Sequence, residues 1–335
     1  MAPDSVTLAA GGSTVAIVPA LGGKIASLHL GGREWLWRSD VIPWSVPDER
    51  LAADDHASYV ELADTGGYDE CFPTVGACRV PDGVPGAGGV ALPDHGELWA
   101  QHAPTTTGRD DAGAPTATTR WQGRRMAYAF SRTVAVERDG AVRMTYAVES
   151  RASERLPFLW SSHPLLPLTP DTRLELPVAA RVRVWAQHGL DLGGERAEHR
   201  WPVLRVRENA GEPDARFGPR EHDFTWPARR GAPYACKLFL DLPRPATGTV
   251  RLAVEQGDGR LEVEVDPREV THLGLWLNHG GWTPFAGKPA YRNLAFEPCI
   301  GAPDPLDAAL DRWQGAAWLA PGETRTWTLR WRGHR

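Results

Sequence analysis

Alternation of apolar and polar residues is the clearest pattern in this chain, and it is strongest over residues 126–149. Apolar residues occupy most alternate positions there, on both sides of an Asp139-Gly140 step. This pattern predicts a β-hairpin with a type I′ turn. A second hairpin is predicted over residues 250–265, around Gly257-Asp258-Gly259. Each hairpin has one apolar and one polar face, which is typical of antiparallel sheets.

Short runs of strand-forming residues continue from one end of the chain to the other. Further strands are predicted at 14–18, 24–30, 34–37, 156–160, 178–185, 236–242, 272–277, 294–297 and 324–331. One segment favours a helix, with Asp304 as N-cap, Pro305 at the first helical position, an apolar face ending at Trp313, and Gly315 as the stop. Because open twisted sheets seldom exceed about ten strands, we expect an all-β protein with two large packed sheets.

The chain lacks the features that divide a sequence into separate units. No repeat of fixed period occurs, and the Gly- and Pro-rich stretch 80–93 is short enough to be a loop. We therefore expect residues 1–335 to form a single domain. The composition agrees with this all-β prediction, because 35 Gly and 29 Pro in 335 residues favour turns over long helices.

Charge and hydropathy narrow the possible function classes. The net charge is −5, and the 37 basic residues, all Arg except Lys24, Lys237 and Lys288, are scattered among 42 acidic ones. We therefore expect no nucleic-acid partner. No long uncharged apolar run occurs and the first residues lack a secretory signal, which predicts a cytoplasmic protein without a membrane partner. The four cysteines form no Cys-x-x-Cys pair, so we expect free, buried thiols.

Motifs for cofactors and metals fail once their context is checked. Gly86-x-Gly88-x-x-Ala91 lacks the strand before it and the helix after it that a dinucleotide fingerprint requires. His95-Gly96-Glu97 has the spacing of zinc deaminases, but the second thiol expected after Cys299 would fall at Ala302. A metal site would need ligands assembled from distant strands. The sequence therefore predicts no metal and no cofactor.

Three polar residues, each following an apolar or aromatic segment, remain as candidates for chemistry: His95, His163 and Glu297. Each is followed by Gly or Pro, so we expect it to end a strand and face a cleft. A carboxylate and an imidazole in one pocket suit general acid–base catalysis without a cofactor. The alternative is structural, with His163 capping a strand end in the core and Glu297 paired with an arginine.

The segments around these residues resemble the galactose mutarotase-like (aldose 1-epimerase) superfamily. The similarity covers most of the chain, and the order and spacing of its pieces are more specific than any single piece. The pieces are residues 21–28, 32–37, 67–74, His95-Gly96-Glu97, His163-Pro164, Glu297-Pro298 and Leu319-x-Pro321-Gly322-Glu323. This resemblance implies a β-supersandwich of large, mostly antiparallel sheets with few short helices, whose concave face binds a sugar.

The resemblance also implies roles for the three residues. Glu297 would act as the base that takes the proton of the anomeric hydroxyl, while His163 protonates the ring oxygen so that the C1–O5 bond opens. Rotation about C1–C2 and closure would give the other anomer. His95 would hydrogen-bond the sugar near the ring oxygen. The resemblance therefore implies an isomerase.

Several positions depart from the well-known mutarotases. Pro164 and residues 165–168 stand where those proteins have aromatic residues and an Asn, and Tyr68-Asp69-Glu70 stands in place of an Asn-Arg pair. We expect Asp69 and Glu70 to contribute sugar contacts of their own, and galactose is not assumed to be the substrate.

Three further residues are candidates for sugar binding. Lys237 lies roughly where the family places a sugar-contacting side chain, and its alternative is an edge-strand lysine that points to water. Trp276 and Asn278 offer an aromatic platform and an amide, which suit the apolar faces and polar rims of sugars. The alternative for Trp276 is core packing, because it alternates with leucines.

Three functions stay open at this point. The first is epimerisation of a neutral hexose, the second is epimerisation of a phosphorylated or sulfonated sugar bound by arginine, and the third is carbohydrate binding without catalysis. Glycan hydrolysis would need a second carboxylate, from Asp69 or Glu70. In each case we expect a monosaccharide or modified sugar as partner and a monomer or homodimer.

Among 15 tryptophans, Trp160, Trp276 and Trp282 are expected near the site, and Trp185 in sheet packing.

Overall fold

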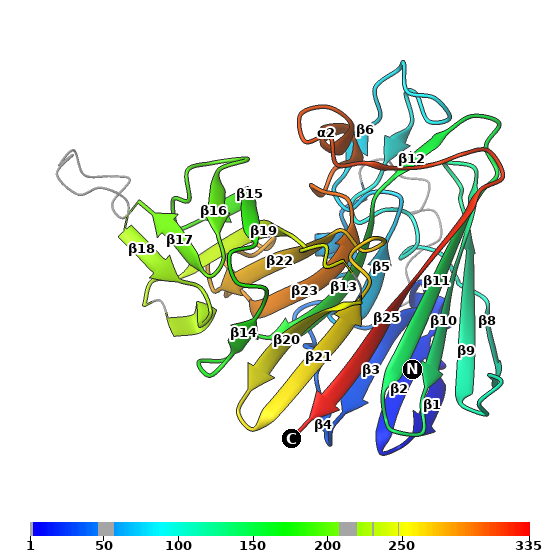
Figure 1. Cartoon of the computed structure of the whole chain (residues 1–335), viewed down its shortest axis with the longest axis horizontal. Helices are drawn as coiled ribbons and strands as arrows, with labels where there is room; N and C mark the ends of the chain where they lie inside the picture. Colours follow the sequence, from blue (N-terminus) through cyan, green and yellow to red (C-terminus); the bar gives the residue numbers. More distant parts are fainter. Residues whose placement is uncertain (1–2, 46–56, 208–219, 230, 247) are drawn as a thin grey trace.

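The computed structural model describes residues 3–45, 57–207, 220–229, 231–246 and 248–335, and most of its regular structure is β (Figure 1). Within these residues there are two short α-helices, α1 (Tyr59–Leu62) and α2 (Leu306–Leu310), and two 3-10 turns, η1 (Pro19–Leu21) and η3 (Pro227–Arg229). The predicted all-β class is confirmed. None of the described helices is long and apolar enough to cross a membrane.

Two large sheets contain most of the strands. The first has 13 strands, in the order β1 (Val6–Ala10), β2 (Ser13–Val18), β3 (Lys24–Leu30), β5 (Tyr68–Cys71), β13 (Trp160–Pro167), β23 (Arg292–Ile300), β22 (His272–His279), β19 (Tyr234–Asp241), β15 (Arg181–His188), β16 (Glu198–Arg200), β17 (Val203–Val206) and β18 (Arg220–Asp223), with β4 (Arg33–Glu34) on β3. The second has eight, in the order β14 (Arg173–Glu175), β20 (Val250–Gln256), β21 (Gly259–Val265), β25 (Thr324–His334), β11 (Val142–Ser150), β10 (Tyr128–Val136), β9 (Pro115–Gln122) and β8 (Thr105–Arg109). Two small pairs complete the set, β12 (Leu156–Phe158) with β24 (Ala317–Leu319) and β6 (Cys78–Arg79) with β7 (Ala91–Leu92).

Aromatic side chains from both sheets meet in the core between them. Trp160 of β13 packs against Tyr146 of β11 and Trp327 of β25, with ring centroids 4.7 and 4.9 Å apart. Tyr146 and Trp327 are themselves stacked. Tyr68 of β5 contacts Trp331 edge to face. The two sheets therefore pack face to face, and Trp160 belongs to their core rather than to the cavity where the sequence placed it.

Both predicted hairpins form, but the first turn is not the predicted one. Strands β10 and β11 pair from Tyr128–Ser150 to Val136–Val142. The amide of Gly140 donates to the carbonyl of Glu137, and only Gly140 of these loop residues has a positive φ, of 81°. A type I′ turn needs positive φ at two central residues, so the loop is instead a type I turn followed by a left-handed glycine. The second hairpin closes as predicted, with Gln256 paired to Gly259.

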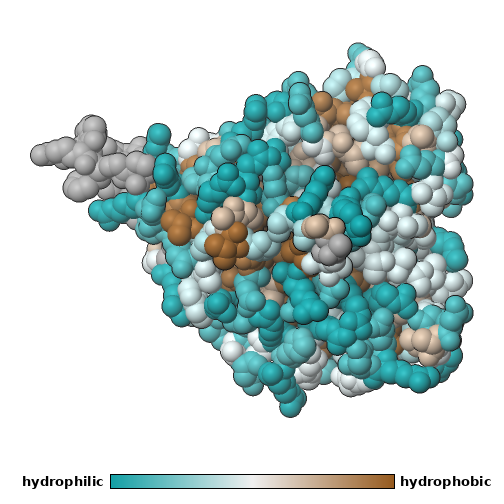
Figure 2. All heavy atoms as spheres, in the orientation of Figure 1, coloured by the Kyte–Doolittle hydropathy of each residue, from teal (hydrophilic) through white to brown (hydrophobic). Residues whose placement is uncertain are grey.

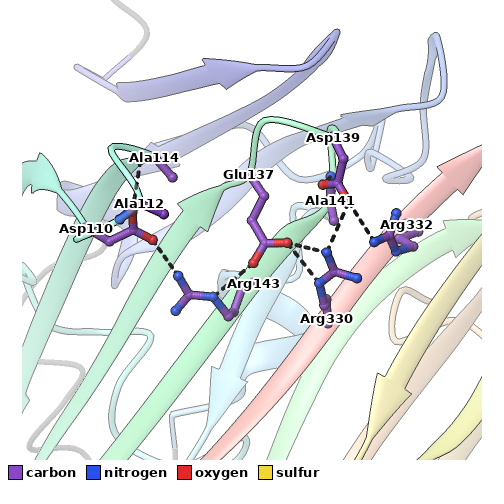
Figure 3. A network of polar contacts seen from close by, with 9 residues as sticks. All are labelled: Asp110, Ala112, Ala114, Glu137, Asp139, Ala141, Arg143, Arg330 and Arg332. Carbon is purple, nitrogen blue, oxygen red and sulfur yellow. Dashed lines mark hydrogen bonds and ion pairs between the residues drawn. The ribbon is translucent and has the colours of Figure 1, made fainter.

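The outer face of the eight-stranded sheet is a network of arginines and carboxylates (Figure 3). Arg143 lies between Asp110 and Glu137, at 2.6 and 3.0 Å, and Arg330 reaches both Glu137 and Asp139. Isolated pairs this exposed contribute about 0–1 kcal/mol each, although connected ones do better. Figure 2 shows one side of the molecule, covered mainly by hydrophilic side chains with apolar patches between them. Part of the arginine surplus therefore lies in cross-strand surface pairs.

The predicted C-terminal helix is shorter than expected and begins later. Helix α2 covers only Leu306–Leu310, and its N-cap position is held by Pro305 rather than Asp304. The amides of Val75 and Gly76 donate to the main-chain carbonyl of Asp304 at 2.9 and 2.8 Å. These bonds hold the segment before the helix against the chain that follows β5, and the Asp304 side chain faces a cavity instead of capping the helix.

Candidate active site

His163 and Glu297 lie opposite each other on the neighbouring central strands β13 and β23. The ladder between these strands pairs Ser161 with Cys299 and Leu165 with Ala295, and His163 stands across from Glu297 in the stretch between. Nδ1 of His163 lies 3.0 Å from Oε1 of Glu297. The sequence placed both residues at strand ends, but both strands continue.

Two prolines occupy the same stretch of the ladder. Pro164 follows His163 and Pro298 follows Glu297, and in this part of the described chain no main-chain pairing joins the strands between the two flanking pairs. Proline has no N–H to donate, which explains the break. The hydroxyl of Ser162 donates to the carbonyl of Pro298 at 3.0 Å and bridges the strands there instead.

The carboxylate of Glu297 is completely buried and has three polar neighbours. Lys237 contacts Oε2, Ser161 donates to the same oxygen at 3.2 Å, and His163 contacts Oε1. Burial alone would raise the pKa of Glu297, but the opposite charge of Lys237 and the contact with His163 hold it below its ordinary value. Glu297 is therefore an anion at neutral pH.

A glycine makes room for this ion pair. Gly274 of β22 lies opposite Glu297 in the ladder, and Lys237 of β19 reaches across it to the carboxylate. A Cβ at this position would lie 2.8 Å from Oε2 of Glu297 and 3.5 Å from Nζ of Lys237. The buried pair is thus built around a position with no side chain.

Lys237 also pairs with Asp304, at 3.3 Å. Burial would lower the pKa of Lys237, but Asp304 and Glu297 raise it above its ordinary value, so the ammonium stays charged. Burial raises the pKa of Asp304, and Lys237 offsets only part of that increase. Lys237 thus links two carboxyl groups at the cavity. The alternative interpretation, an edge-strand lysine that points to water, is wrong.

His95 reaches the same place from a loop. Its amide donates to Val75 at 2.6 Å, and that of Glu97 donates to Phe72 at 3.0 Å. Between them Gly96, at φ 71°, lies so close to Phe72 that a Cβ would come within 2.2 Å of its carbonyl oxygen. The His-Gly-Glu step is therefore fixed by a contact that only glycine allows.

The His95 ring is held on two sides and faces His163. Its Nδ1 lies 2.9 Å from Asp94, and Tyr59 stacks on the ring with centroids 4.2 Å apart. The ring centroids of His95 and His163 are 5.0 Å apart. Burial would lower the pKa of His95, but the neighbouring Asp94 carboxylate raises it above its ordinary value.

These side chains surround a cavity of about 260 Å³. Five of the eight candidate residues line it, namely His95, His163, Lys237, Trp276 and Glu297. Trp276 and Trp282 form one apolar corner, with ring centroids 5.6 Å apart at nearly a right angle. The other lining residues are Val60, Asp64, Val75, Gly76, Asp94, Leu165, Trp185, Ala186 and Asp304. The cavity is smaller than the sites typical of drug-sized ligands.

The remaining three candidates lie elsewhere. Asp69 does not line the cavity; it accepts a hydrogen bond from Tyr59 and pairs with Lys24 at 2.6 Å. Its neighbour Glu70 points to the opposite face of β5, into the core between the sheets, where it pairs with Arg132 at 3.0 Å. Burial raises the pKa of Glu70 to about 7, despite Arg132.

Asn278 is also fully buried and away from the cavity lining. Its side-chain oxygen accepts from the amide of Gly281 at 3.1 Å, and its amide donates to the carbonyl of Trp282 at 3.0 Å. Asn278 therefore holds the turn that carries Trp282 into the cavity, and it positions Trp282 without lining the cavity itself.

Sequence reasoning missed several lining residues. Asp304 was interpreted as the N-cap of a helix and not as a site residue. No motif marks Asp64 or Asp94, which are acidic residues near aromatic segments. Trp185 was expected in sheet packing, yet it lines the cavity. The thiols were predicted correctly as free, with Cys71, Cys236 and Cys299 buried and Cys78 partly exposed.

Comparison with known proteins identifies the fold class. No family model matches the chain, and no curated protein matches its sequence. Among solved structures it is similar to the Slr1438 protein of Synechocystis, with a TM-score of 0.64 and 17% identity over 99% of this chain and 96% of that one. A galactose mutarotase related enzyme from Lactobacillus acidophilus has a TM-score of 0.60 and 16% identity, over 99% and 98%. A galactose mutarotase-like protein from Clostridium acetobutylicum has 0.61 and 13%, over 99% and 95%. The chain therefore has the galactose mutarotase-like fold, as the resemblance in its sequence indicated.

Proposed function

We propose that this protein is a cofactor-independent aldose 1-epimerase, an isomerase that interconverts the α and β anomers of a hexose. The observation that carries the proposal is the direct contact of His163 with Glu297, at 3.0 Å, at the edge of a small cavity with tryptophan walls. The galactose mutarotase-like fold also supports the proposal, through similarity of fold alone.

The chemistry needs one base and one acid close together. The anomeric hydroxyl and the ring oxygen are bonded to the same carbon atom, so the groups that exchange protons with them must also be neighbours. In the proposed reaction Glu297 takes the hydroxyl proton and His163 gives a proton to the ring oxygen, which opens the C1–O5 bond. Rotation and closure with the two roles reversed give the other anomer and restore both groups.

The cavity lining favours a neutral sugar. Trp276 and Trp282 offer apolar surface for the C–H faces of a sugar ring, and His95 offers a hydrogen bond. Among the described lining residues Lys237 is the only lysine or arginine, and it is already paired with Glu297 and Asp304. A phosphorylated or sulfonated sugar would therefore meet carboxylates without a free cation, which argues against the acidic-sugar alternative.

The test is anomer exchange across a panel of neutral aldoses, measured by NMR exchange spectroscopy. We expect the protein to accelerate exchange for at least one sugar, and Glu297→Gln to reduce that acceleration by about 100- to 10,000-fold, the usual contribution of a general base. The matched control is Glu149→Gln, because Glu149 is half exposed on β11 and remote from the cavity. Equal rates for Glu297→Gln and the wild type would overturn the assignment.

Carbohydrate binding without catalysis is a second candidate, and one observation favours it. Both carboxylate oxygens of Glu297 already have partners, and Lys237 holds one of them through a buried ion pair. A sugar hydroxyl must replace one of these contacts before Glu297 can act as a base. Saturable binding of an aldose with no acceleration of its anomer exchange would establish this function instead.

A further inference from the structure

Three metal-ligating side chains from separate segments meet beside the cavity. Sγ of Cys71 and one ring nitrogen each of His95 and His163 lie within 4.8 Å of one another. They come from β5, from the loop before Leu98, and from β13. The sequence predicted no metal site because the ligands would have to come from distant strands, and the fold brings such ligands together.

The sheet register explains how two of them meet. Asp69 pairs with His163 in the antiparallel ladder, so their side chains share a face of the sheet, and Cys71 lies two positions further along the same face. His95 is brought to this face by the parallel bridge between Phe72 and Gly96. The cluster is therefore held by regular structure.

Both imidazoles carry a carboxylate on the same ring nitrogen. Nδ1 of His95 contacts Asp94 at 2.9 Å and Nδ1 of His163 contacts Glu297 at 3.0 Å. This leaves Nε2 of each ring for another partner. A carboxylate on the second nitrogen is the usual support of a metal-binding histidine, because it fixes the tautomer and increases the basicity of the ligand.

The distances allow a metal ion after a small adjustment. If three atoms lie within 4.8 Å of one another, some point lies no further than about 2.8 Å from each. Zinc bonds are about 2.0–2.1 Å to imidazole nitrogen and 2.3 Å to sulfur. Each ligand would therefore move by less than about 0.8 Å.

The surroundings also favour a cation. Asp64 lines the same cavity, is 6% exposed, and has no hydrogen-bond partner for Oδ1 in the described part of the chain. With Asp94, Glu297 and Asp304 it makes four carboxyl groups around the cavity. The pKa values of Asp94 and Glu297 lie below the ordinary range, whereas burial raises those of Asp64 and Asp304. Carboxylates that line a cleft raise the local concentration of cations. Cys71 itself is fully buried, and no hydrogen bond to its thiol is found among the residues that the structure describes.

We propose that Cys71, His95 and His163 bind a divalent zinc-class ion. On binding, the Cys71 thiol releases its proton to solvent and the S–H bond is replaced by a bond from sulfur to the metal, with no change of oxidation state. One thiolate and two imidazoles favour Zn²⁺ over Mg²⁺ or Ca²⁺. The ion takes Nε2 of His163, the nitrogen that is not in contact with Glu297, so metal binding and the proposed proton transfer exclude each other. Only this last consequence rests on the proposed function.

The binding test titrates the full chain with Zn²⁺, and with Mg²⁺ as a negative control, and measures binding by isothermal titration calorimetry. We expect one equivalent of Zn²⁺ and no Mg²⁺ to bind, and Asp94→Asn to weaken Zn²⁺ binding by about 10- to 100-fold. Cys71→Ser should weaken it by at least as much. Cys78→Ser is the matched control, because Cys78 is also a free thiol but lies outside the cluster. Equal Zn²⁺ binding by Cys71→Ser and the wild type would refute the site, and so would no binding to the wild type.

A second measurement needs no variant and covers the case in which a substitution prevents folding. Co²⁺ added to the wild-type protein should give a thiolate-to-cobalt charge-transfer absorption that Zn²⁺ abolishes. Binding of Co²⁺ without that absorption would exclude Cys71 as a ligand. Anomer exchange is then measured with Zn²⁺ and with a chelator, and we expect loss and recovery. Zn²⁺ binding without any exchange activity would count against the proposed function and leave the metal site standing.

Discussion

Gly274 allows the sharpest test of the buried ion pair, because replacing it with alanine adds one methyl group at a known place. The new Cβ would lie 2.8 Å from Oε2 of Glu297 and 3.3 Å from Cβ of the same residue. The first distance is shorter than van der Waals contact allows, so the Glu297 carboxylate or the backbone of Gly274 must shift, and the ion pair with Lys237 is disturbed. Both partners are at most 5% exposed, so a weakened contact between them is poorly compensated by bulk water.

Two opposing effects set the magnitude. Exchanging glycine for alanine in a strand stabilises a protein by about 0.4–1 kcal/mol when the space is free, because the unfolded chain loses freedom. Overpacking a filled site costs about 1–3 kcal/mol, and separating a buried ion pair costs about 3–5 kcal/mol. Overpacking less the gain from alanine leaves a net loss of about 0–2.6 kcal/mol, and any weakening of the ion pair adds to it. We therefore expect Gly274→Ala to lower the free energy of unfolding by about 1–3 kcal/mol, measured by equilibrium urea denaturation.

The matched control is Gly83→Ala. A Cβ added at Gly83 would have no other atom within 4 Å, and the residue has no positive φ, so the same substitution there should be neutral or slightly stabilising. If Gly274→Ala were as stable as the control, Glu297 and Lys237 could not be packed against Gly274 in this way. Neither measurement depends on what the protein catalyses or binds.

Two other buried groups give predictions that urea denaturation also checks. Arg132→Met should lower the free energy of unfolding by about 3–5 kcal/mol, because it leaves Glu70 buried without its arginine partner. Adding Glu70→Leu to the same chain should restore part of the lost stability. If the stability changes of the two substitutions were strictly additive, the pairing would be contradicted. Burial, opposed by Asp241 and reinforced by Arg183, lowers the pKa of His272 to about 4, from 6.5. Between pH 6.5 and pH 4, His272 is therefore protonated in the unfolded chain but neutral in the folded chain. The free energy of unfolding should fall by up to about 3 kcal/mol as the pH drops from 6.5 to 4. His272→Gln should flatten that slope, and an unchanged slope would show that another group causes it.

The parts of the fold that could be predicted from sequence are those in which local pattern and tertiary structure agree. Strand β11 alternates throughout and β10 alternates up to Val134, because one face packs on the core and the other is partly exposed. Strand β13 is buried on both faces and carries two prolines, so periodicity found only its beginning. The turn at Gly140 was wrong in type because the sequence shows an Asp-Gly step but not the length of the loop around it.

The candidate site could be predicted only in part, for a related reason. Adjacent residues of a strand face opposite sides, so Asp69 and Glu70 could not both lie on the His163 side of the sheet, and the sequence does not say which one does. Asp304 had a satisfactory local explanation as a helix cap, and only the tertiary contact with the chain after β5 turns it towards Lys237. Gly274 carried no signal at all, because its role depends on side chains from two other strands.

The paired prolines of β13 and β23 remove main-chain hydrogen bonds between these two strands at the level of the site. Strands joined by a full ladder resist sliding, since each small displacement strains several main-chain hydrogen bonds together. Where Pro164 and Pro298 interrupt the ladder, the spacing of the strands is set by side chains, namely the contact of His163 with Glu297 and the Ser162 hydroxyl on the Pro298 carbonyl. Each of the two residues stays paired to its outer neighbour strand, His163 to β5 and Glu297 to β22, so a ligand that changes their spacing would have to displace side-chain contacts rather than main-chain hydrogen bonds between the two strands.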